Sequence, residues 1–445
     1  MPFIFLKYLQ PVHYFRLASK MGQTVFPIVE ELPADITELL VKDTDFESDI
    51  AQDYDLSWQA IQKGYIGSAT TYKAFETLSV RDNYYFIRKN FHPAWVFYIL
   101  LLRLITLCNP LKEVHAWYST RSTKREALWL KPIQYSGWHS FQSALLKASP
   151  KVSVVIPTLN RYDYLKDILC DLEQQDYTNF EVIIVDQSDS FEAAFYDKFK
   201  LDIHLIRQEE KALWLARNTA IKKAKGSLIA LSEDDVRVDP NWISEHIKCL
   251  DFFKADVSAG VFHPINQSIP PERSFFSLAS QFATGNAMLY RGVFKKVGLF
   301  DRQFEKQRMG DGEFGMRLHL AGIKSVSNPK ASCIDVKANV GGLRELGSWD
   351  AFRPSKFFSP RPIPSVLYFY RRYFGNQAAR FALLRTVPLS IFPYQFKRNR
   401  LLLLIGAVIS VLLLPIVCVQ VLMSWRLATK KIVEGPKTEQ WHATN

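Results

Sequence analysis

Cysteine is scarce in this chain, and its spacing excludes two common structural devices. No two cysteines form a C-x-x-C pair, and their number is odd. Both features argue against a disulfide framework and against a cysteine zinc site, and they favour a reducing compartment. The five positions are Cys108, Cys170, Cys249, Cys333 and Cys418.

Signatures of nucleic-acid binding are also absent, although the net charge is +12. The sequence contains no zinc-finger spacing, no aromatic RNA-binding motif and no basic leucine zipper. Its basic residues recur along the chain, many of them near apolar stretches, which suits an anionic membrane surface at least as well as nucleic acid. We therefore expect no nucleic-acid partner.

Long uncharged runs are rare, and the hydrophobic fraction of 48% is too low for a polytopic membrane protein. One run, residues 401–423, carries no charge and has Lys or Arg near both ends. As a helix it would extend roughly 34 Å, against about 30 Å for a bilayer core. The sequence predicts one transmembrane helix at 401–423 and a polar tail at 424–445. A buried core helix is the alternative.

The segments next to this run differ from it in composition. Residues 377–396 mix apolar side chains with arginines and two prolines, so we expect 347–400 to be amphipathic and to lie along lipid headgroups. Residues 1–150 are expected to form a mostly helical accessory region. Its apolar run at 95–107 is too short to span a bilayer, so it is either a core helix or a second interfacial contact.

Short β-branched runs alternate with helical spacing from residue 151 onward. This alternation predicts an α/β fold with an open, mostly parallel sheet flanked by helices, in a domain at 151–346. Ligands bind such sheets at the carboxyl ends of the strands, where polar residues follow each run. We expect strands at 152–157, 180–186 and 203–206 and before Glu233, and a helix at 213–224 that is capped by Gly226.

Three consecutive acids, Glu233, Asp234 and Asp235, end the last of these runs. On a strand, residues two apart point to the same side, so Glu233 and Asp235 would face one way and Asp234 the other. Paired carboxylates suit Mg²⁺ or Mn²⁺. The alternative is that Asp234 or Asp235 caps the next helix or is solvated in a loop.

Seven motifs from this region occur in a fixed order. They are PTLNR, IIVDQSD, LARN, SEDDV, TGNAMLYR, VGLFD and GDGEFGMRLHLAG. Together they resemble the catalytic domain of the family-2 inverting glycosyltransferases of the GT-A fold. The resemblance covers roughly residues 151–346, and it implies a nucleotide-sugar donor, a divalent metal (Mn or Mg) and a single inverting displacement.

The resemblance also implies roles for individual residues. Gln187 stands where many relatives have Asp, which leaves the base identity open, and Glu233 stands where Asp is more usual. The implied nucleotide-sugar contacts are Pro157, Thr158, Asn160, Arg161, Asp186, Gln187, Arg217 and Asp234. The implied metal ligands are Glu233, Asp235 and Asp335, the last at a position where relatives often have His. The implied catalytic residues are Asp311, as the base, and Glu313, as its support.

Asp311 carries the chemistry that the acceptor needs. An attacking hydroxyl must lose its proton, and a positioned carboxylate base contributes about 10²–10⁴-fold in rate. The flanking glycines would let the acceptor approach closely. The alternatives are that Asp311 caps a helix at 313–320, and that Arg317 forms an ordinary i,i+4 pair.

The sequence therefore predicts a single-pass membrane glycosyltransferase of polysaccharide biosynthesis, with its catalytic domain in the cytoplasm. Its acceptor would be a lipid-linked or envelope glycan. A nucleotidyltransferase is the second possibility, but PTLNRYDYL lacks the Gly-rich basic loop of that class. A catalytically inactive nucleotide-binding membrane scaffold is the third. Retention of the metal acids and of Asp311 argues against it.

Overall fold

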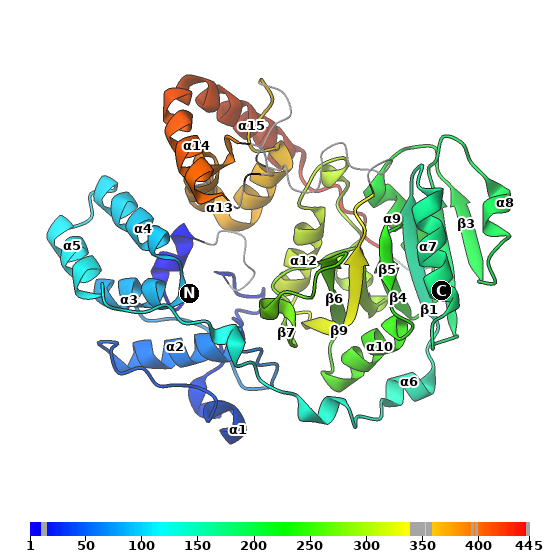
Figure 1. Ribbon diagram of the computed structural model, residues 1–445, viewed down its shortest axis with the longest axis horizontal. Helices are drawn as coiled ribbons and strands as arrows, with labels where there is room; N and C mark the ends of the chain where they lie inside the picture. The colour runs from blue at the N-terminus through cyan, green and yellow to red at the C-terminus, as the bar shows by residue number, and fades with distance from the viewer. Residues whose placement is uncertain (10–15, 339–351, 353–357, 393–395, 397–398, 442–445) are drawn as a thin grey trace. The chain divides into compact units, whose positions relative to one another are not determined.

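The computed structural model describes the chain except for residues 10–15, 339–351, 353–357, 393–395, 397–398 and 442–445 (Figure 1). Two compact units are present. Unit 1 comprises Met1–Gln134 and Tyr370–Leu389, and unit 2 comprises Tyr135–Phe369 and Ser390–Asn445. Parts of the predicted segment 347–400 lie outside the described residues.

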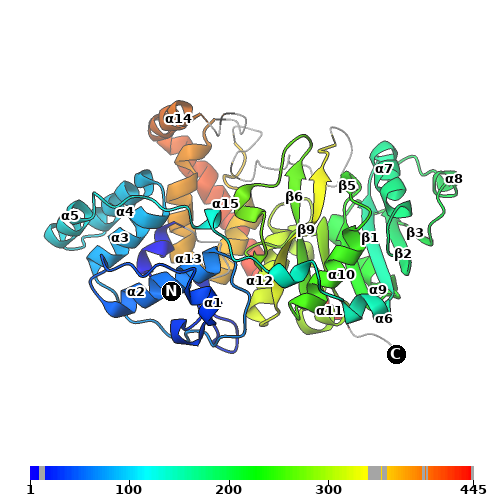
Figure 2. The same cartoon turned by 60° about the horizontal axis from the view of Figure 1, so that its bottom comes forward.

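Unit 1 is built from helices, and Figure 2 displays most of them from a second side. Side chains of Ser48, Ser79 and Asn109 accept hydrogen bonds from the first turns of three of these helices and so define where they begin. The helices are α1 (Ala34–Thr37), α2 (Asp49–Gln62), α3 (Val80–Asn90), α4 (Pro93–Ile105), α5 (Pro110–Ser119) and the second part of α13 (Pro364–Thr386).

Aromatic rings around α3 form the core of unit 1. Phe86 stacks on Phe3, with ring centroids 3.7 Å apart, and meets Trp58 edge-on at 5.1 Å. One buried cation, Lys89, lies beside this core and pairs with Asp43 at 2.7 Å and Asp55 at 2.8 Å. Pairing a buried ammonium offsets the cost of removing it from water.

Unit 2 contains one nine-stranded sheet in the order β3-β2-β1-β4-β8-β6-β9-β5, with β7 paired to β9. Strands β3, β2, β1 and β4 are parallel, but β8 runs antiparallel to both β4 and β6. The expectation of a mostly parallel sheet is therefore wrong, because the later strands make the sheet mixed. The strands are β1 (Val152–Thr158), β2 (Phe180–Asp186), β3 (Ile203–Arg207), β4 (Leu228–Ser232), β5 (Val236–Val238), β6 (Val257–Pro264), β7 (Ser277–Leu278), β8 (Asn286–Tyr290) and β9 (Ser325–Asp335).

The predicted strands at 152–157, 180–186 and 203–206 and the predicted helix at 213–224 are confirmed to within a residue or so. Gly226 is not the cap of that helix. The cap is Ala224, and a β-carbon at Gly226 would lie 2.6 Å from the Ser153 amide nitrogen and 2.7 Å from the Lys151 carbonyl oxygen. Gly226 is therefore required by a close backbone approach beside β1.

Helices cover the sheet and position its edge loops (Figure 1). The apolar face of α7 is buried, as its helical spacing predicts. The helices of unit 2 are α6 (Ala144–Ala148), α7 (Tyr162–Glu173), α8 (Ala193–Tyr196), α9 (Leu213–Lys223), α10 (Trp242–Phe252), α11 (Gly292–Val297), α12 (Gly310–Leu320), the first part of α13 (Pro364–Thr386), α14 (Arg400–Leu412) and α15 (Leu414–Glu434).

The predicted single helix at 401–423 is broken. It is divided between α14 and α15, which are bent by 88° relative to each other. Pro415 lies in the first turn of α15, where a helix does not need its backbone N–H. Because proline has no backbone N–H to donate, it cannot continue the hydrogen bonds of α14, and the helix breaks there. No single helix in the described part of the chain is long and apolar enough to cross a membrane, and only this bent pair passes the length and hydropathy criteria together.

Candidate functional site

The carboxyl ends of the parallel strands bring the sequence-predicted polar residues to one edge of the sheet. Thr158 and Asp186, the last residues of β1 and β2, are paired in register. Strand β4 ends at Ser232, so the acids at 233–235 lie in the turn between β4 and β5. The argument that these acids alternate along a strand is therefore wrong, although their clustering at this edge is as predicted.

Asp234 is buried beneath the loop that follows β1. It accepts a hydrogen bond of 2.8 Å from the Thr158 hydroxyl and one of 3.0 Å from Arg161 Nη1. Burial raises the pKa of Asp234 to about 6, and the Arg161 charge opposes this rise. Asp234 does not cap a helix, because β5 follows it.

Arg161 pairs with both the buried Asp234 and the adjacent Asp235. Its Nη1 atom lies 3.1 Å from Asp235 Oδ2 as well as 3.0 Å from Asp234 Oδ1. One guanidinium therefore bridges two consecutive carboxylates, and this offsets part of their mutual repulsion.

Glu233 is held from the other side by Arg217 of α9. The Arg217 side chain is fully buried, and its Nη2 atom donates to the carbonyl oxygens of Thr284 at 3.0 Å and Ser232 at 3.4 Å. The same atom lies 3.5 Å from Glu233 Oε1. Arg217 thus positions Glu233, and its direct contact with a nucleotide stays a prediction.

Asp335, the last residue of β9, lies near two of these acids. Antiparallel pairing of β5 with β9 sets it opposite Val236, next to Asp235. Burial, then the charges of Asp235 and Glu233, raise the pKa of Asp335. Three hard oxygen donors are a set that Mg²⁺ or Mn²⁺ prefers, so the chemistry of these residues suits the metal that the resemblance implies. Their ligand atoms do not all lie within 4.8 Å of one another, so a metal site at these acids stays a prediction.

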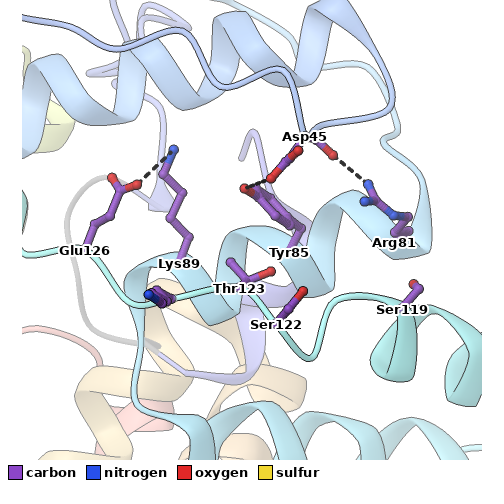
Figure 3. Close-up of a pocket in the computed structure, with 9 residues that line it drawn as sticks. Asp45, Arg81, Tyr85, Lys89, Ser119, Ser122, Thr123 and Glu126 are labelled. Carbon is purple, nitrogen blue, oxygen red and sulfur yellow. Dashed lines mark hydrogen bonds and ion pairs between the residues drawn. The ribbon is translucent and has the colours of Figure 1, made fainter.

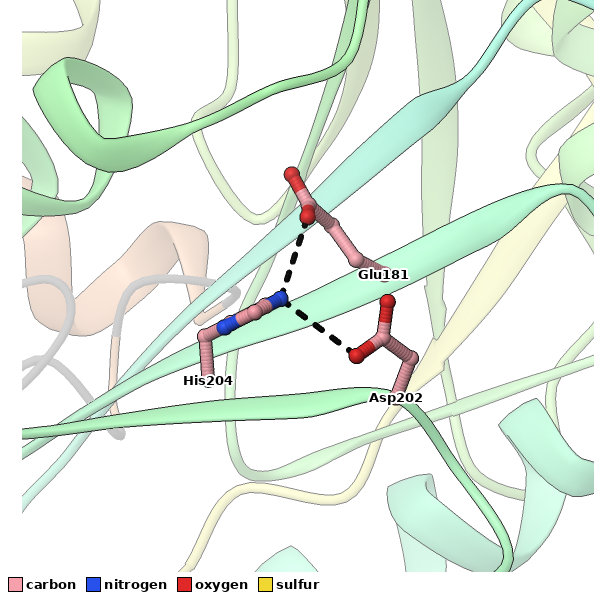
Figure 4. Close-up of side chains that lie close together, drawn as sticks. All are labelled: Glu181, Asp202 and His204. Atoms are coloured by element: carbon pink, nitrogen blue, oxygen red, sulfur yellow. Dashed lines mark ion pairs between the residues drawn. The ribbon is translucent and has the colours of Figure 1, made fainter.

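A tighter group of possible ligands lies at the opposite ends of the strands (Figure 4). Glu181, Asp202 and His204 are the one set in the described chain with ligand atoms within 4.8 Å of one another. As at Asp235 and Glu233, an internal cation pairs with this group: Lys151 Nζ lies 3.3 Å from Glu181 and 3.4 Å from Asp202. It joins the amino ends of β1, β2 and β3, roughly 17 Å along β2 from Asp186. We assign it a structural role.

Asp186 is clamped by two tyrosines that sequence reasoning missed. Its Oδ2 atom accepts from Tyr162 at 2.6 Å and from Tyr196 at 2.8 Å, and its Oδ1 atom accepts from the Ser188 amide at 2.8 Å. Both carboxylate oxygens are thereby oriented.

Gln187 has a different environment. Its Oε1 atom accepts from the Ala212 amide at 2.7 Å and from Gln208 at 3.0 Å. The opposite end, Nε2, is buried and has no hydrogen-bond partner among the described residues. Because the Ala212 amide can only donate, the side-chain orientation is determined, and Nε2 is an unused donor.

Pro157 and Asn160 shape the loop after β1. Pro157 is buried within the strand. Asn160 has a left-handed backbone (φ 54°), and its amide group makes two hydrogen bonds of 2.9 Å with Asp189 in the loop after β2. These bonds fasten the two loops to each other and orient the edge at which the candidate donor site lies.

Asp311 lies within the first turn of α12, and its Oδ1 atom accepts from the Thr284 hydroxyl at 2.5 Å. The capping alternative is wrong, because the helix begins at Gly310, with Met309 as its cap. Since the Thr284 carbonyl accepts from Arg217, one chain of contacts runs from Asp311 through Thr284 and Arg217 to Glu233. Thr284 was not among the predicted residues, although it begins the TGNAMLYR motif.

The glycines beside Asp311 serve packing in at least one case. A β-carbon at Gly310 would overlap three ring atoms of the Trp214 indole, the farthest of them at 2.8 Å. Glycine is therefore needed at position 310 because the Trp214 ring packs against its backbone. At Gly312 the nearest atom would be Met309 Cε at 3.6 Å, an ordinary contact. The expectation that both glycines make room for an acceptor is therefore wrong for Gly310.

Glu313 is fully buried and pairs with Arg317 through both carboxylate oxygens at 3.0 Å. Arg317 also donates to the carbonyl oxygen of Leu299 at 2.9 Å. The i,i+4 pair is thus confirmed, in a buried setting. The support of Asp311 by Glu313 stays a prediction.

A buried polar network lies beneath this edge. Asn286 Nδ2 donates to the Ala331 carbonyl at 2.9 Å, which leaves Oδ1 to accept from Trp242 at 2.8 Å and from His246 Nε2 at 3.0 Å. His246 Nδ1 then accepts from Ser258 at 2.8 Å. Burial lowers the pKa of His246 to about 4, so this ring is neutral near pH 7.

Unit 1 contains a polar cavity of about 350 Å³ that sequence reasoning did not anticipate (Figure 3). Several of its charged groups are paired: Lys89 lies 3.8 Å from Glu126, and Arg81 donates to the Asp45 carbonyl at 2.7 Å. We assign this cavity no catalytic role. Hydroxyl groups of Ser119, Ser122 and Thr123 line the remainder.

Comparison with known proteins identifies relatives of this chain. Residues 153–298 match the family model described as glycosyl transferase family 2. The chain is 26% identical to the glycosyltransferase GlyA of Streptococcus pneumoniae over 163 residues, which is 36% of this chain and 22% of that protein. It is 27% identical to the chondroitin synthase of Escherichia coli over 150 residues, or 33% and 21% of the two chains. The chain thus spans about a fifth of the length of these relatives.

Solved structures give weaker likenesses. The structure of residues 1–349 of TarS from S. aureus in complex with UDP-GlcNAc is 19% identical, with a TM-score of 0.38, over 58% of this chain and 79% of that one. The mannosyltransferase PcManGT from Pyrobaculum calidifontis, in complex with GDP-Man and Mn²⁺, is 17% identical, with a TM-score of 0.40, over 72% and 94%.

Proposed function

We propose, from the glycosyl transferase family 2 domain at residues 153–298, that this protein transfers a sugar from a nucleotide-sugar donor to an acceptor hydroxyl with inversion. The observation that carries the proposal is the chain of contacts from Asp311 through Thr284 and Arg217 to Glu233. It links the candidate base to the candidate metal acids within one edge of the sheet.

Glu233, Asp235 and Asp335 are the residues that would hold a divalent cation. Their side chains are partly accessible, at 25% for Glu233 and 13% for Asp235. Burial, and then the charges of Asp235 and Glu233, raise the pKa of Asp335. When bound, the cation would neutralise charge on the departing nucleoside diphosphate. Arg161, which pairs with Asp235, would help to neutralise that negative charge.

Asp311 would accept the proton of the attacking hydroxyl. Thr284 holds Oδ1, and this orients Oδ2 as the atom that receives the proton. The buried pair of Glu313 with Arg317 stiffens the helix that carries Asp311. The sugar carbon would then form its bond to the acceptor oxygen as its bond to the diphosphate oxygen breaks.

Gln187 would contact the nucleotide base. Its unused Nε2–H donor is buried at the end of β2, and a carbonyl oxygen of a base would satisfy it. The oriented carboxylate of Asp186, one residue earlier, would accept from a base N–H or a ribose hydroxyl.

We further propose that the acceptor is lipid-linked or an envelope glycan and that the protein works at a membrane. The bent pair α14 and α15 would attach it, since several apolar side chains there are exposed, among them Leu404 at 64% and Leu412 at 76%. The catalytic unit would face the cytoplasm, where nucleotide sugars are made. A bent pair does not define the number of crossings, so the single-pass arrangement is retained only as a prediction.

Donor hydrolysis by the purified protein with Mn²⁺ tests the proposal. A panel of nucleotide sugars is first screened by thermal shift, because a ligand that binds the native state raises the apparent Tm. Free sugar plus nucleoside diphosphate is the expected product. Release of pyrophosphate would instead indicate a nucleotidyltransferase, and binding without turnover would indicate a scaffold.

Asp311→Asn gives the sharper test of the base. We expect turnover to fall by about 10²–10⁴-fold while donor affinity stays nearly unchanged. Asp167→Asn, which neutralises an exposed acid on α7, is the matched control and should retain activity. Equal loss of turnover and binding in Asp311→Asn would contradict its role as the base.

A further inference from the structure

Helix α4 has apolar side chains on both of its faces. Its inner face is packed in the core of unit 1, where Val96, Ile99 and Leu102 are buried. Its outer face is also apolar, and Phe97, at 60% exposure, is the first of its exposed side chains. A helix that is hydrophobic all round is ordinarily covered on all sides, by protein or by lipid.

The exposed side chains continue onto α5, which the two ribbon views both place beside α4. Leu107, in the turn between the helices, is 92% exposed, and Leu111, at the start of α5, is 81% exposed. Monomeric soluble proteins seldom display so many large apolar side chains together. We define the outer apolar face as Phe97, Leu101, Ile105, Leu107, Leu111 and Val114.

Charge near this face is mostly positive, and the first exposed acid beyond it is Glu126, whose side chain is 49% exposed. The one acid between residues 92 and 125 is Glu113, which is buried and bonded to Arg103 at 2.6 Å and to Tyr84 at 2.9 Å. The exposed ionic groups of this stretch are therefore all basic. They are Lys112, Arg121, Lys124 and Arg125.

Aromatic residues border the same face. Tyr118 is 56% exposed, and the Arg121 guanidinium lies 3.8 Å from its ring centroid. Arg88 stacks on Trp117 at 5.3 Å. Aromatic rings with a polar edge are common at the level of a bilayer where lipid headgroups meet acyl chains, and cations beside them can contact the headgroups.

We propose that the α4–α5 hairpin is a membrane-docking surface for anionic lipid, in which the outer apolar face enters the bilayer interface and the four exposed cations contact lipid phosphates. Such a surface needs apolar side chains, which the outer face of α4 provides, and nearby cations, which the mostly basic border provides. A bilayer explains both at once, whereas a second copy of the chain would bring the same positive charges together. The surface lies outside the candidate transferase site, so its failure would leave the proposed transfer reaction unaffected.

The test uses the full chain with a fluorescent NBD probe on a new cysteine, Leu111→Cys. Cys108, Cys170 and Cys418 are replaced by Ser, because they are not buried, while the buried Cys249 and Cys333 are kept. Met21→Cys is the matched control, since Met21 is 72% exposed in unit 1 but outside the hairpin. Because α14 and α15 are expected to bind vesicles by themselves, the local probe is measured and not total binding.

We expect the probe at position 111 to shift to shorter emission wavelength and to be quenched by brominated lipid in vesicles containing phosphatidylglycerol. The probe at position 21 should report water. The quadruple variant Lys112→Gln, Arg121→Gln, Lys124→Gln and Arg125→Gln should weaken the response to anionic vesicles by about tenfold or more. Phe97→Ser with Leu101→Ser should also reduce it, and both side chains are exposed, so the fold should persist.

Two results would overturn the proposal. One is a probe at position 111 that remains in water while the protein is bound to anionic vesicles. The other is an emission shift without lipid, accompanied by dimerisation in light scattering, since the face would then be an interface between copies of the chain.

Discussion

Alanine at Gly310 should damage the enzyme far more than alanine at Gly312, although the two glycines lie on either side of Asp311 in the same helical turn. A β-carbon at Gly310 would have three indole atoms of Trp214 within 2.8 Å. The nearest atom for one at Gly312 would be 3.6 Å away. The pair of variants therefore separates a packing requirement from a general requirement for flexibility.

The magnitudes follow from these contacts. Alanine is intrinsically better than glycine in a helix by about 1 kcal/mol, so Gly312→Ala should leave stability unchanged or raise it slightly. In Gly310→Ala, restoring van der Waals separation requires the helix start or Trp214 to move by roughly 1 Å. Overpacking of this kind costs about 1–3 kcal/mol. Because Asp311 is the next residue, a shift of that size should lower turnover by about 10²-fold.

The assay combines chemical unfolding with donor hydrolysis. Trp214→Phe in the Gly310→Ala background provides a rescue, since the smaller ring should recover part of both losses, and the recovery measures the coupling between the two positions. Equal behaviour of the two alanine variants, or no rescue, would refute the assignment of Gly310 to Trp214 packing.

Three further predictions come from the same unit. Thr284→Val should lower kcat by about tenfold or more while leaving donor binding intact, because Oδ1 of Asp311 loses its fixed donor; an equal rise in KM would contradict this. Mn²⁺ should raise the Tm of the wild-type protein but not that of a Glu233→Gln, Asp235→Asn double variant. Calorimetric titration of Mn²⁺ into both proteins checks this, and equal binding by the two would show that the ion binds at another site. The pKa of His246 is about 4 in the folded chain and about 6.5 in the unfolded chain. As the pH falls from 6.5 to 4, the free energy of unfolding should therefore decrease by about 3 kcal/mol, because the unfolded chain binds the proton first. His246→Gln should flatten that slope in denaturant titrations, and an unchanged slope would assign it to other groups.

Local patterns predicted the first half of the sheet well. β-branched runs and the helical spacing of α7 are properties of contiguous residues, so β1, β2, β3 and α9 could be located from the sequence. Parallel strands carry their carboxyl ends to a common edge, so the proximity of Thr158, Asp186 and the acids after β4 followed from the alternation alone.

Features that depend on distant segments were missed or mistaken. The mixed sheet arises because β8 is inserted antiparallel between β4 and β6, and no local pattern encodes that order. Hydropathy predicts one helix across the bend before Pro415, because it measures how apolar the residues are and not whether the backbone hydrogen bonds can continue. Trp214 and Gly310 meet across almost one hundred residues of sequence, so the reason for that glycine is visible only in three dimensions.

By itself the sequence determined which chemical groups are available: a run of acids after a buried strand, a carboxylate between two glycines, and basic residues beside apolar stretches. Tertiary structure decided which of these groups act together. Arg217 reaches Glu233 and the Thr284 carbonyl, and the Thr284 hydroxyl reaches Asp311, because β4 and β8 pair and α9 packs against the sheet. Hydrogen bonds and ion pairs act over a few ångströms, so chain order names the participants and only folding brings them within that distance.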